Sequence, residues 1–377
     1  MPERFSVTYR ITAHDFKEAK ARAVAIALEQ TVEIPHDIIP SGYIADEIVG
    51  LVEEISSLGS NLYSVKISYS TDSAGPDLPQ LMNVIFGNSS MQKGIKVTDL
   101  SLNEKLVSYF PGARFGISGV RAATRRENGA LIAPVLKPIG LSSHNLALIA
   151  QRAVLAGADI VKEDHGLSNQ PSAPFYERIP LISEMVAKAN AARQACGDTT
   201  RSLYFPNIGG SIKEIIKKAF FAKDSGADGI LIIPGLLGFD AINSLAQDEN
   251  FALPIMAHPS FLGPYVVNID SGFTHSMMFG TMMRLAGADI SVFPNFGGRF
   301  SFSKSECISI VSACQSLAGP GNPIMPCPGG GMTVKLVSEL QKLYKENCIY
   351  LLGGELLRYG DKIGDGIIKI RQVLGSD

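Results

Sequence analysis

Hydrophobic and polar positions follow two different patterns along this chain, and the first occupies the N-terminal third. Residues 5–11 alternate like a half-buried strand, and residues 15–30 have the apolar spacing and alanine content of a helix that begins near Asp15. The other predicted elements here are strands at residues 62–70 and 81–86 and a helix at residues 103–109. Strands and helices alternating over this length predict an α+β domain of ferredoxin-like type, which we place at residues 1–115.

A second pattern begins near residue 131 and repeats. The tripeptide Gly-Ala-Asp occurs at Gly157, Gly226 and Gly287, each time after a helix-like stretch and before an apolar run. A glycine past a helix end and then an apolar run predict a helix stop followed by a buried parallel strand. Successive copies lie about two βα units apart, since one unit takes ~30 residues.

Filling in the intermediate units gives eight strand candidates, at residues 132–136, 159–162, 202–205, 229–233, 253–257, 289–293, 323–325 and 348–352. Eight such strands with helical segments between them predict a (β/α)8 TIM barrel, which we place at residues 116–377. A doubly wound sheet is the rival, although such sheets usually have about five or six strands. The predicted fold class is therefore α/β, a C-terminal barrel with an N-terminal α+β domain.

The chemically useful side chains fall at the carboxyl ends of the predicted strands, where barrel enzymes carry their active sites. In chain order these positions hold Lys137, Lys162, Asp164, His165, Asn207, His258, Asn295, Gly329, Gly330, Gly331, Gly353, Gly354 and Glu355. Core packing alone does not explain why ionisable residues gather on one rim. We therefore expect an active site at this end of the barrel.

Lys162, Asp164 and His165 form a candidate metal site. Side chains two apart in a strand point to one side, so Lys162 and Asp164 share a face. A carboxylate and an imidazole can hold a divalent cation, for which oxygen ligands favour Mg²⁺. The lysine can join them only as an anionic carbamate formed with CO₂, because an ammonium has donors only. The alternative is a buried ion pair between Lys162 and Asp164.

Two further residues are candidates for proton transfer. Lys137 ends an apolar run, and an amine close to other cations at the top of a barrel can serve as a general base. It could instead neutralise a substrate phosphate or pair with a carboxylate. His258 ends a short apolar strand, where it could orient a substrate oxygen or transfer a proton. A hydrogen-bonded core histidine is the competing interpretation of His258.

Glycine runs follow the seventh and eighth predicted strands, where barrels recurrently bind phosphate. They include Gly330, Gly331, Gly353 and Gly354. Without β-carbons, their backbone N–H groups can approach phosphate oxygens closely. Tight turns alone are the alternative explanation.

Charge and composition exclude several classes of function for the 377 residues. Lys and Arg total 34 against 36 Asp and Glu, without a long basic block, so we expect no nucleic-acid or membrane partner. No apolar run approaches ~18 residues and the N-terminus lacks an apolar signal stretch, which predicts a cytoplasmic protein. The five cysteines have no CxxC spacing, so we expect reduced core thiols, neither disulfides nor zinc ligands.

Several segments of the chain resemble a known family in order and spacing. They are residues 133–142 (APVLKPIGLS), 156–171 (AGADIVKEDHGLSNQP), 283–289 (MRLAGAD), 325–331 (MPCPGGG) and 351–355 (LLGGE). Together they resemble the large subunit of ribulose-bisphosphate carboxylase, and more closely its non-carboxylating form IV relatives, the RuBisCO-like proteins. Residues 27–33 (ALEQTVE) and 86–90 (FGNSS) are similar to that family's N-terminal contributions to an active site shared across a dimer.

The resemblance implies roles for individual residues. Lys162 matches the lysine that CO₂ carbamylates, Asp164 a ligand of Mg²⁺, and Lys137 the active-site lysine of the KP motif. His258 matches the histidine after strand five, while Gly331, Gly353 and Gly354 match a phosphate grip. Glu29 and Asn88 match residues that a partner subunit lends to the site, which implies an obligate homodimer.

Departures from the family pattern argue against carboxylation of ribulose bisphosphate. His165 replaces a metal-binding glutamate, so a metal that tolerates nitrogen ligands gains ground over Mg²⁺. The positions where carboxylases place other substrate-binding groups hold Ile139, Pro259, Val292 and Gly329. The loop at residues 294–301 has no match to the lysine that assists carboxylation, and we take Arg299 and Asn207 as candidate substrate contacts instead. A second phosphate would be poorly held.

One phosphate site, a metal site and a lysine suit proton abstraction next to a carbonyl through a metal-stabilised enolate. The resemblance to RuBisCO-like proteins implies a singly phosphorylated keto compound as substrate. The leading hypothesis is decarboxylation or C–C cleavage of a 3-oxo sugar-acid phosphate of the 3-oxo-isoapionate 4-phosphate type. The alternative is a methylthio-ketose phosphate enolase or isomerase of methionine salvage. A second alternative, from another functional class, is a phosphate-binding protein without turnover.

Overall fold

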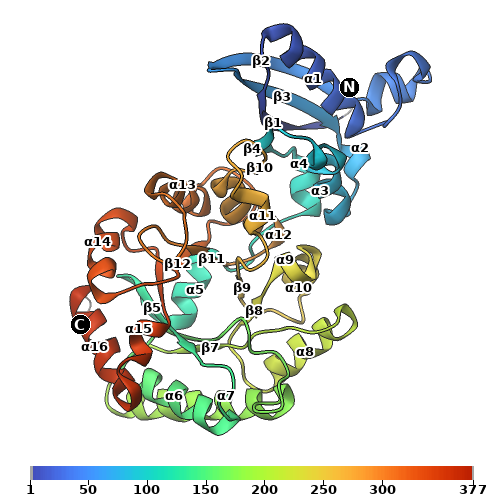
Figure 1. The fold of residues 1–377 in the computed structure, drawn as a ribbon. Helices are drawn as coiled ribbons and strands as arrows, with labels where there is room; N and C mark the ends of the chain where they lie inside the picture. The colour runs from blue at the N-terminus through green and yellow to red at the C-terminus, as the bar shows by residue number, and fades with distance from the viewer. Residues whose placement is uncertain (1–2, 376–377) are drawn as a thin grey trace.

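The computed structural model describes residues 3–375, which form a sheet-and-helix domain and a barrel (Figure 1). The N-terminal elements are β1 (Arg4–Thr12), α1 (Phe16–Glu29), β2 (Leu51–Gly59), β3 (Leu62–Ser70), α2 (Thr71–Ala74), α3 (Leu78–Phe86), β4 (Ile95–Ser101) and α4 (Glu104–Tyr109). The four strands pair antiparallel in the order β4-β1-β3-β2. This order and connectivity are those of the predicted ferredoxin-like domain.

The N-terminal predictions are confirmed except at residues 81–86, which lie in helix α3 and not in a strand. Asp77 caps this helix by accepting the N–H of Gln80, and Leu78 and Leu81 are buried on one side. The six apolar-rich residues were too short a window to distinguish a helix from a strand. The prediction also omits β2 and β4. Strand β2 lies at the sheet edge and most of its residues are exposed, so its sequence does not alternate clearly.

The barrel has all eight predicted strands. They are β5 (Leu131–Leu136), β6 (Ile160–Glu163), β7 (Leu203–Phe205), β8 (Ile230–Ile232), β9 (Ile255–Ala257), β11 (Ile290–Pro294), β12 (Met325–Gly329) and β13 (Ile349–Leu352). Parallel pairing runs β13-β5-β6-β7 and β8-β9-β11-β12, and a bridge from Asn207 to Leu231 joins β7 to β8. Strands β12 and β13 lie side by side and complete the ring. The (β/α)8 prediction is confirmed.

Helix α5 (Gly116–Thr124) closes the amino-terminal end of the ring, where its Val120 packs among the inward-facing strand residues. The other helices surround the ring (Figure 1). They are α6 (Ser143–Leu155), α7 (Phe175–Ala195), α8 (Ile212–Asp224), α9 (Pro234–Leu237), α10 (Asp240–Gln247), α11 (Gly263–Val266), α12 (Met283–Ala286), α13 (Lys304–Gln315), α14 (Val334–Tyr344), α15 (Gly354–Leu357) and α16 (Ile363–Val373). A two-residue strand between them, β10 (Gly272–Phe273), pairs with β4. The N-terminal sheet therefore includes a strand from the later part of the chain.

Alternating side chains of the strands fill the barrel interior. On β5, Leu131, Ala133 and Val135 belong to this inner core, whereas Ile132 and Leu136 pack outward against helices. On β6, Ile160 points inward. Because side chains two apart share a face, Lys162 also points into the barrel, near its carboxyl end.

The three Gly-Ala-Asp repeats act as predicted at their glycines and contribute a further contact through their aspartates. Gly157, Gly226 and Gly287 have φ between 85° and 101°, which ends the preceding helices. Each aspartate then accepts a backbone N–H from the neighbouring strand, with Asp159 bonded to Ile132, Asp228 to Tyr204 and Asp289 to Ile255. The repeat thus joins adjacent strands at the amino-terminal end of the barrel, opposite the expected active site.

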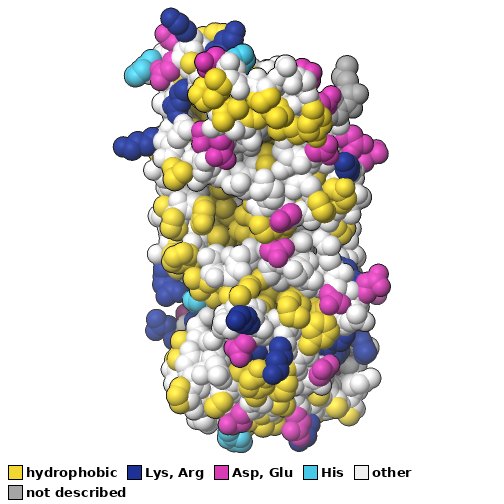
Figure 2. Space-filling model, turned by 90° about the vertical axis from the view of Figure 1, so that its right-hand side faces the viewer, with side chains coloured by type: hydrophobic (Ala, Val, Ile, Leu, Met, Phe, Trp, Pro, Cys, Tyr) yellow, Lys and Arg dark blue, Asp and Glu magenta, His cyan; other side chains and the backbone are white. Residues whose placement is uncertain are grey.

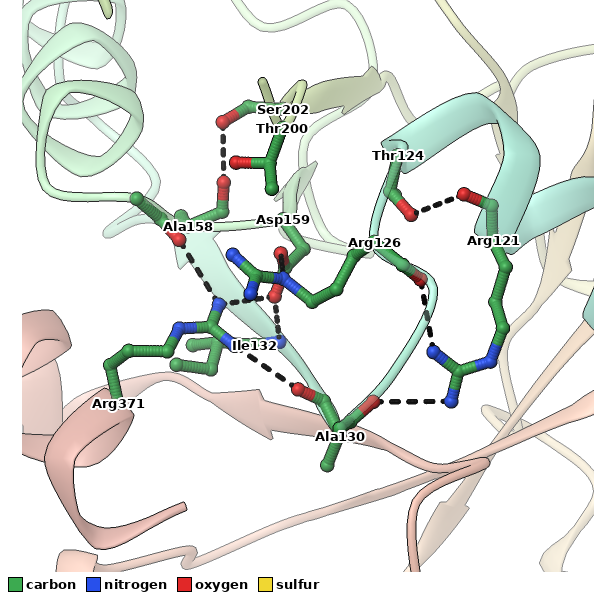
Figure 3. A network of polar contacts seen from close by, with 12 residues as sticks. Arg121, Thr124, Arg126, Ala130, Ile132, Ala158, Asp159, Thr200, Ser202 and Arg371 are labelled. Carbon is green, nitrogen blue, oxygen red and sulfur yellow. Dashed lines mark hydrogen bonds and ion pairs between the residues drawn. The ribbon is translucent and has the colours of Figure 1, made fainter. Parts of the chain in front are cut away.

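The carboxylate of Asp159 also binds two arginines (Figure 3). Arg126 donates to one carboxylate oxygen at 2.6 Å, and Arg371 of α16 donates to the other. Arg371 also donates to the carbonyl of Ala130, just before β5. The last helix is thereby tied to the first two strands of the barrel.

Asp289 differs because its carboxylate receives only backbone donors, from Phe115, Gly116 and Ile255. Burial raises the pKa of Asp289 to about 6, above the ~3.9 of an unfolded aspartate. Stabilisation from the protonated form is therefore present below about pH 4 and lost as the pH rises through 6, by up to about 3 kcal/mol. We expect the free energy of unfolding of wild type, measured in urea, to fall by this amount relative to that of Asp289→Asn between pH 4 and 7.5. A difference that stays constant over this range contradicts the assignment.

Four of the cysteines are buried, as expected, but Cys196 is exposed. It follows directly after α7, at the solvent-facing end of a long helix. No helix within residues 3–375 combines the length and apolarity needed to cross a membrane.

Candidate active site

A cavity of about 1,020 Å³ opens at the carboxyl ends of the barrel strands. Residues at or after the ends of β5, β6, β9, β11, β12 and β13 line it. The predicted site residues in this lining are Lys137, Lys162, Asp164, His165, His258, Arg299, Gly330, Gly331, Gly353 and Gly354. Asn207, Glu29 and Asn88 lie elsewhere. The structure thus brings together the residues predicted from the strand ends, except Asn207 and Asn295. Asn295 is fully buried and accepts a hydrogen bond from the hydroxyl of Tyr344 at 2.7 Å.

Lys162 lies deepest among the charged groups of the cavity. Its side chain extends inward from β6, beside Val135 of β5, and the residue is only 1% exposed. Burial, together with the positive charge of Lys137, lowers the pKa of Lys162 to about 8 against the opposing effect of Asp164. A substantial part of this amine is therefore neutral near physiological pH, the form that reacts with CO₂.

Asp164 is paired with Lys137, and not with Lys162 as the alternative interpretation proposed. The Oδ1 atom of Asp164 lies 3.0 Å from Nζ of Lys137 and 3.5 Å from Nδ1 of His165. Burial raises the pKa of Asp164, but the hydrogen bonds from His165 and Lys137 outweigh it and hold the pKa well below its usual range. The carboxylate is therefore ionised and adjacent to the catalytic lysine candidate.

Glu163 occupies the opposite side of β6 from Lys162 and Asp164, and it fixes the segment that follows. The buried carboxylate accepts two hydrogen bonds from Arg178, at 2.6 and 3.1 Å, and another from Tyr204. Arg178 also donates to the carbonyls of Ser168 and Ala173 in the same segment. These positioning residues were not recognised from the sequence. The alternation of the strand, which directs Glu163 away from the cavity, is the signal that could have identified them.

His165 and His258 stack at the cavity wall, with ring centroids 4.2 Å apart and planes inclined by 15°. Burial lowers the pKa of His258 well below its usual value, and the nearby charges of Lys162 and His165 lower it further. The Nδ1 atom of His258 accepts the N–H of Ser260 at 3.3 Å. A neutral imidazole that accepts at Nδ1 carries its proton on Nε2, so His258 is suited to donate to a substrate oxygen.

The glycines after β12 and β13 leave backbone N–H groups free for a ligand. Gly330 and Gly331 have φ of 85° and 96°, which other residues rarely adopt. Within residues 3–375, the N–H groups of Gly330, Gly331 and Gly353 donate to no protein acceptor. A Cβ placed on Gly353 would lie 3.6 Å from Cε of Lys137. The candidate phosphate site is therefore directly beside the candidate proton-transfer amine.

Arg299 and an apolar surface complete the cavity. The N–H of Arg299 donates to the carbonyl of Gly330 at 3.1 Å, which holds the loop after β11 against the glycines. Its guanidinium lies over the ring of Phe300, 5.6 Å from the centroid. The remaining lining is largely apolar, including Val135, Phe261, Val267, Phe279, Val292, Phe293, Phe300, Phe302, Met332 and Leu351.

The structure corrects the prediction that Asn207 contacts the substrate. The residue supports the site from beneath and does not line the cavity. The residue is 1% exposed. Its side-chain amide donates to the carbonyls of His165 and Leu167, at 3.1 and 2.6 Å. The short strand β7 turns its carboxyl end into the pairing with β8, and Asn207 forms that bridge.

Glu29 and Asn88 lie in the N-terminal domain and do not line this chain's own cavity. They lie together, with Nδ2 of Asn88 donating to Oε1 of Glu29 at 3.0 Å and to Glu33 at 3.3 Å. Both are solvent-accessible. This placement is compatible with their expected action in another subunit's cavity.

The residues present fit a divalent cation only when Lys162 is modified. Within residues 3–375, no three carboxylate, imidazole or thiolate groups gather as a metal site. Asp164 and His165 supply two ligands, and the unmodified lysine adds a repelling charge. Carbamylation would convert that charge into an anionic oxygen donor on the same wall of the cavity. The lowered pKa of Lys162 favours this modification.

Comparison with known proteins identifies the family. The family model for the ribulose bisphosphate carboxylase large chain, catalytic domain, matches residues 116–295. The crystal structure of a Rubisco-like protein from Rhodopseudomonas palustris superimposes on this chain with a TM-score of 0.85 and 34% sequence identity. The match covers 100% of this chain and 98% of that protein's chain. The chain belongs to the RuBisCO-like proteins. It is a non-carboxylating relative of the RuBisCO large subunit.

Several relatives of this RuBisCO-like protein have names that specify a reaction. A 5-methylthioribulose-1-phosphate isomerase from Rhodospirillum rubrum is 35% identical over 96% of this chain and 94% of its own length. A 2,3-diketo-5-methylthiopentyl-1-phosphate enolase from Geobacillus thermodenitrificans is 32% identical over 94% of this chain and 88% of its own length. These names correspond to the alternative hypothesis, the methylthio-ketose reaction, more closely than to the sugar-acid reaction.

Proposed function

We propose that this RuBisCO-like protein is an isomerase or enolase that moves a proton at a carbon next to the carbonyl of a singly phosphorylated methylthio-ketose. One observation carries the proposal: a single cavity unites free backbone N–H groups, an adjacent lysine and an extensive apolar wall. A ketose with phosphate at one end and a methylthio group at the other matches this division. The named isomerase and enolase relatives support the same class of substrate.

The residues of the chain divide the work as follows. The N–H groups of Gly330, Gly331 and Gly353 bind the phosphate. The Nζ atom of Lys137 separates from Asp164 and first gives one proton to solvent. The resulting neutral amine takes the proton from the carbon next to the carbonyl and returns it to the neighbouring carbon. Because the same amine accepts and delivers the proton, isomerisation consumes none. The Nε2–H group of His258 donates to a substrate oxygen and orients it.

Asp164, His165 and the carbamate of Lys162 would hold a divalent cation, with Mg²⁺ as the first candidate. When bound, such a cation supplies a Lewis acid for the substrate carbonyl. Glu163 and Arg178 keep the Asp164–His165 segment in place, and the closed floor of the barrel excludes water beneath it. The proposal therefore requires both a divalent metal and CO₂ as activators.

The sugar-acid reaction stays a second candidate because two arginines, Arg299 and Arg358, line the same cavity. A carboxylate would need such a partner. Arg358 is already near Glu355, at 3.6 Å, which leaves Arg299 as the available cation. The apolar wall and the names of the relatives favour the methylthio-ketose over this substrate.

We further propose that the enzyme works as a homodimer in which Glu29 and Asn88 complete the partner's site. Exposed apolar side chains on the N-terminal domain support an interface there. In Figure 2 they gather at the end of the molecule that this domain forms. The large exposed apolar residues of this domain are Phe16, Val24, Ile38, Tyr43, Ile44, Leu51, Leu58, Met91 and Val107.

The function is tested by NMR in D₂O with Mg²⁺ and bicarbonate. We expect 5-methylthioribulose 1-phosphate to exchange hydrogen for deuterium at the carbons next to the carbonyl and to form an isomer. In parallel, 2,3-diketo-5-methylthiopentyl 1-phosphate tests enolisation, and a 3-oxo sugar-acid phosphate tests CO₂ release. CO₂ release from the sugar acid without exchange in either methylthio compound would reject the proposal in favour of the second candidate. Phosphate binding without turnover of any compound would favour a binding protein.

A further inference from the structure

Phe261 has a backbone conformation that bulky side chains rarely adopt. Its φ is 67°, in the left-handed region that glycine and asparagine tolerate best. The residue lines the cavity and is 68% exposed. A large apolar ring held in an unfavourable conformation at a cavity mouth is typical of a ligand contact, since core packing does not require it there.

The turn that carries Phe261 is closely fitted to its surroundings. A Cβ placed on Gly235 of α9 would lie 2.5 Å from the carbonyl oxygen of Ser260 and 3.1 Å from Cβ of Phe261. Only a glycine at position 235 therefore leaves room for this turn. The backbone and the Cβ of Phe261 are therefore positioned by close packing against α9.

The rest of residues 259–271, which we call the β9–β10 segment, is anchored to the N-terminal domain. The buried amine of Lys96 donates to the carbonyl of Asn268 at 2.5 Å. The guanidinium of Arg10 donates to the carbonyl of Ile269. Beyond the segment, β10 pairs with β4. The wall of the cavity that Phe261 belongs to is thus fixed at both of its ends.

This wall lies on a different part of the cavity rim from the candidate phosphate site. In the ring of strands, β11 separates β9 from β12, and β13 lies one strand further on. The residues of the β9–β10 segment that line the cavity carry no charge, and they are Pro259, Ser260, Phe261, Gly263 and Val267. A substrate held by its phosphate at β12 and β13 would therefore extend an apolar end, and not a second anionic group, toward Phe261.

We propose that Phe261 determines specificity by covering the apolar end of the substrate. The identity of that end as a methylthio group rests on the proposed function. The exposed ring then gains a contact on binding that a hydroxyl-terminated sugar cannot supply. Phe261 contributes to the affinity for this end and takes no part in proton transfer.

The test compares two alcohols that lack the carbonyl and cannot react, 5-methylthioribitol 1-phosphate and ribitol 1-phosphate. Their binding is measured by calorimetry on the intact enzyme with Mg²⁺ and bicarbonate. We expect wild type to prefer the methylthio compound by about 10- to 100-fold, the usual contribution of a small apolar group in a pocket. Phe261→Asn, which suits the left-handed backbone, should lose most of this preference and keep the affinity for ribitol 1-phosphate within about twofold. The control is Leu317→Asn, an exposed apolar residue outside both the cavity and the N-terminal domain, and it should keep the preference.

Several outcomes overturn the proposal. Equal binding of both alcohols by wild type shows that the apolar end is not recognised, and an unchanged preference in Phe261→Asn shows that another residue recognises it. Loss of affinity for both alcohols in the variant indicates a structural role. Phe261→Gly should unfold at no lower denaturant concentration than wild type, because glycine adopts this φ without strain. If wild type turns over none of the ketoses but Phe261→Asn abolishes the binding preference, the proposed function fails and the assignment of Phe261 stands.

Discussion

Replacing Lys137 by methionine is expected to lower kcat for the proposed proton transfer by about 100- to 10,000-fold, the usual contribution of a positioned acid–base group. Methionine keeps the length and packing of the side chain but removes the amine that lies 3.0 Å from Asp164 and beside Gly353. The measurement is the rate of deuterium incorporation into 5-methylthioribulose 1-phosphate. Exchange should fall together with isomer formation, because both need the same proton transfer.

Lys137→Arg provides the matched control. The arginine keeps a cation next to Asp164 but stays protonated and cannot act as a base. If proton transfer is the role of Lys137, the arginine variant should be nearly as inactive as the methionine variant, with a KM close to wild type. Arginine-supported exchange near the wild-type rate would show that Lys137 only balances the charge of Asp164 or of the phosphate.

Most of the fold follows from features that are local in the sequence. Gly-Ala-Asp at Gly157, Gly226 and Gly287 predicts helix ends because each glycine supplies the positive φ that terminates a helix, and buried parallel strands appear as continuous apolar runs. Strand β2 could not be found in this way. As an exposed edge strand it is specified by backbone pairing with β3, which leaves little trace in side-chain polarity.

In the candidate site, too, some features could be predicted from the sequence and others could not. Its members could be predicted because the carboxyl ends of parallel strands converge, whatever the exact register. Pair geometry could not be predicted: Asp164 faces both Lys137 and Lys162, and only the structure shows that the ion pair forms with Lys137. Asn207 occupies a strand end like the others, yet its side-chain amide donates to the carbonyls of His165 and Leu167 and so supports the segment carrying His165.

The left-handed backbone conformation of Phe261 could not be predicted from the sequence. Nothing in the sequence Pro-Ser-Phe-Leu predicts a left-handed residue, since the conformation is imposed by tertiary contacts with Gly235 and by the anchored segment that follows. Sites of this kind, where local preference and the observed backbone disagree, are where function is most often found.

Replacing Lys162 by methionine is expected to abolish CO₂-dependent activation and to lower kcat by about 1,000-fold or more, because the third metal ligand is lost from a site whose electrostatics carry the reaction. In wild type, activation by dissolved CO₂ should depend on pH. With the pKa of Lys162 lowered to about 8 by burial, the neutral amine increases about tenfold between pH 7 and pH 9. The rate of carbamate formation at fixed CO₂ should rise by the same factor, measured by ¹³C NMR of enzyme treated with ¹³CO₂ and Mg²⁺.

Asp164→Asn separates formation of the carbamate from its retention. This variant keeps the amine of Lys162 but loses an anionic metal ligand, so we expect the ¹³C signal to form in excess ¹³CO₂ and to disappear after gel filtration, whereas wild type with Mg²⁺ retains it. Removing the divalent metal from wild type with a chelator should have the same effect. Full activity of wild type in CO₂-free, metal-free buffer would contradict the carbamate and leave Asp164 as the partner of Lys137 alone. A carbamylation rate that falls as the pH rises would instead show that the amine of Lys162 is not the group that CO₂ modifies.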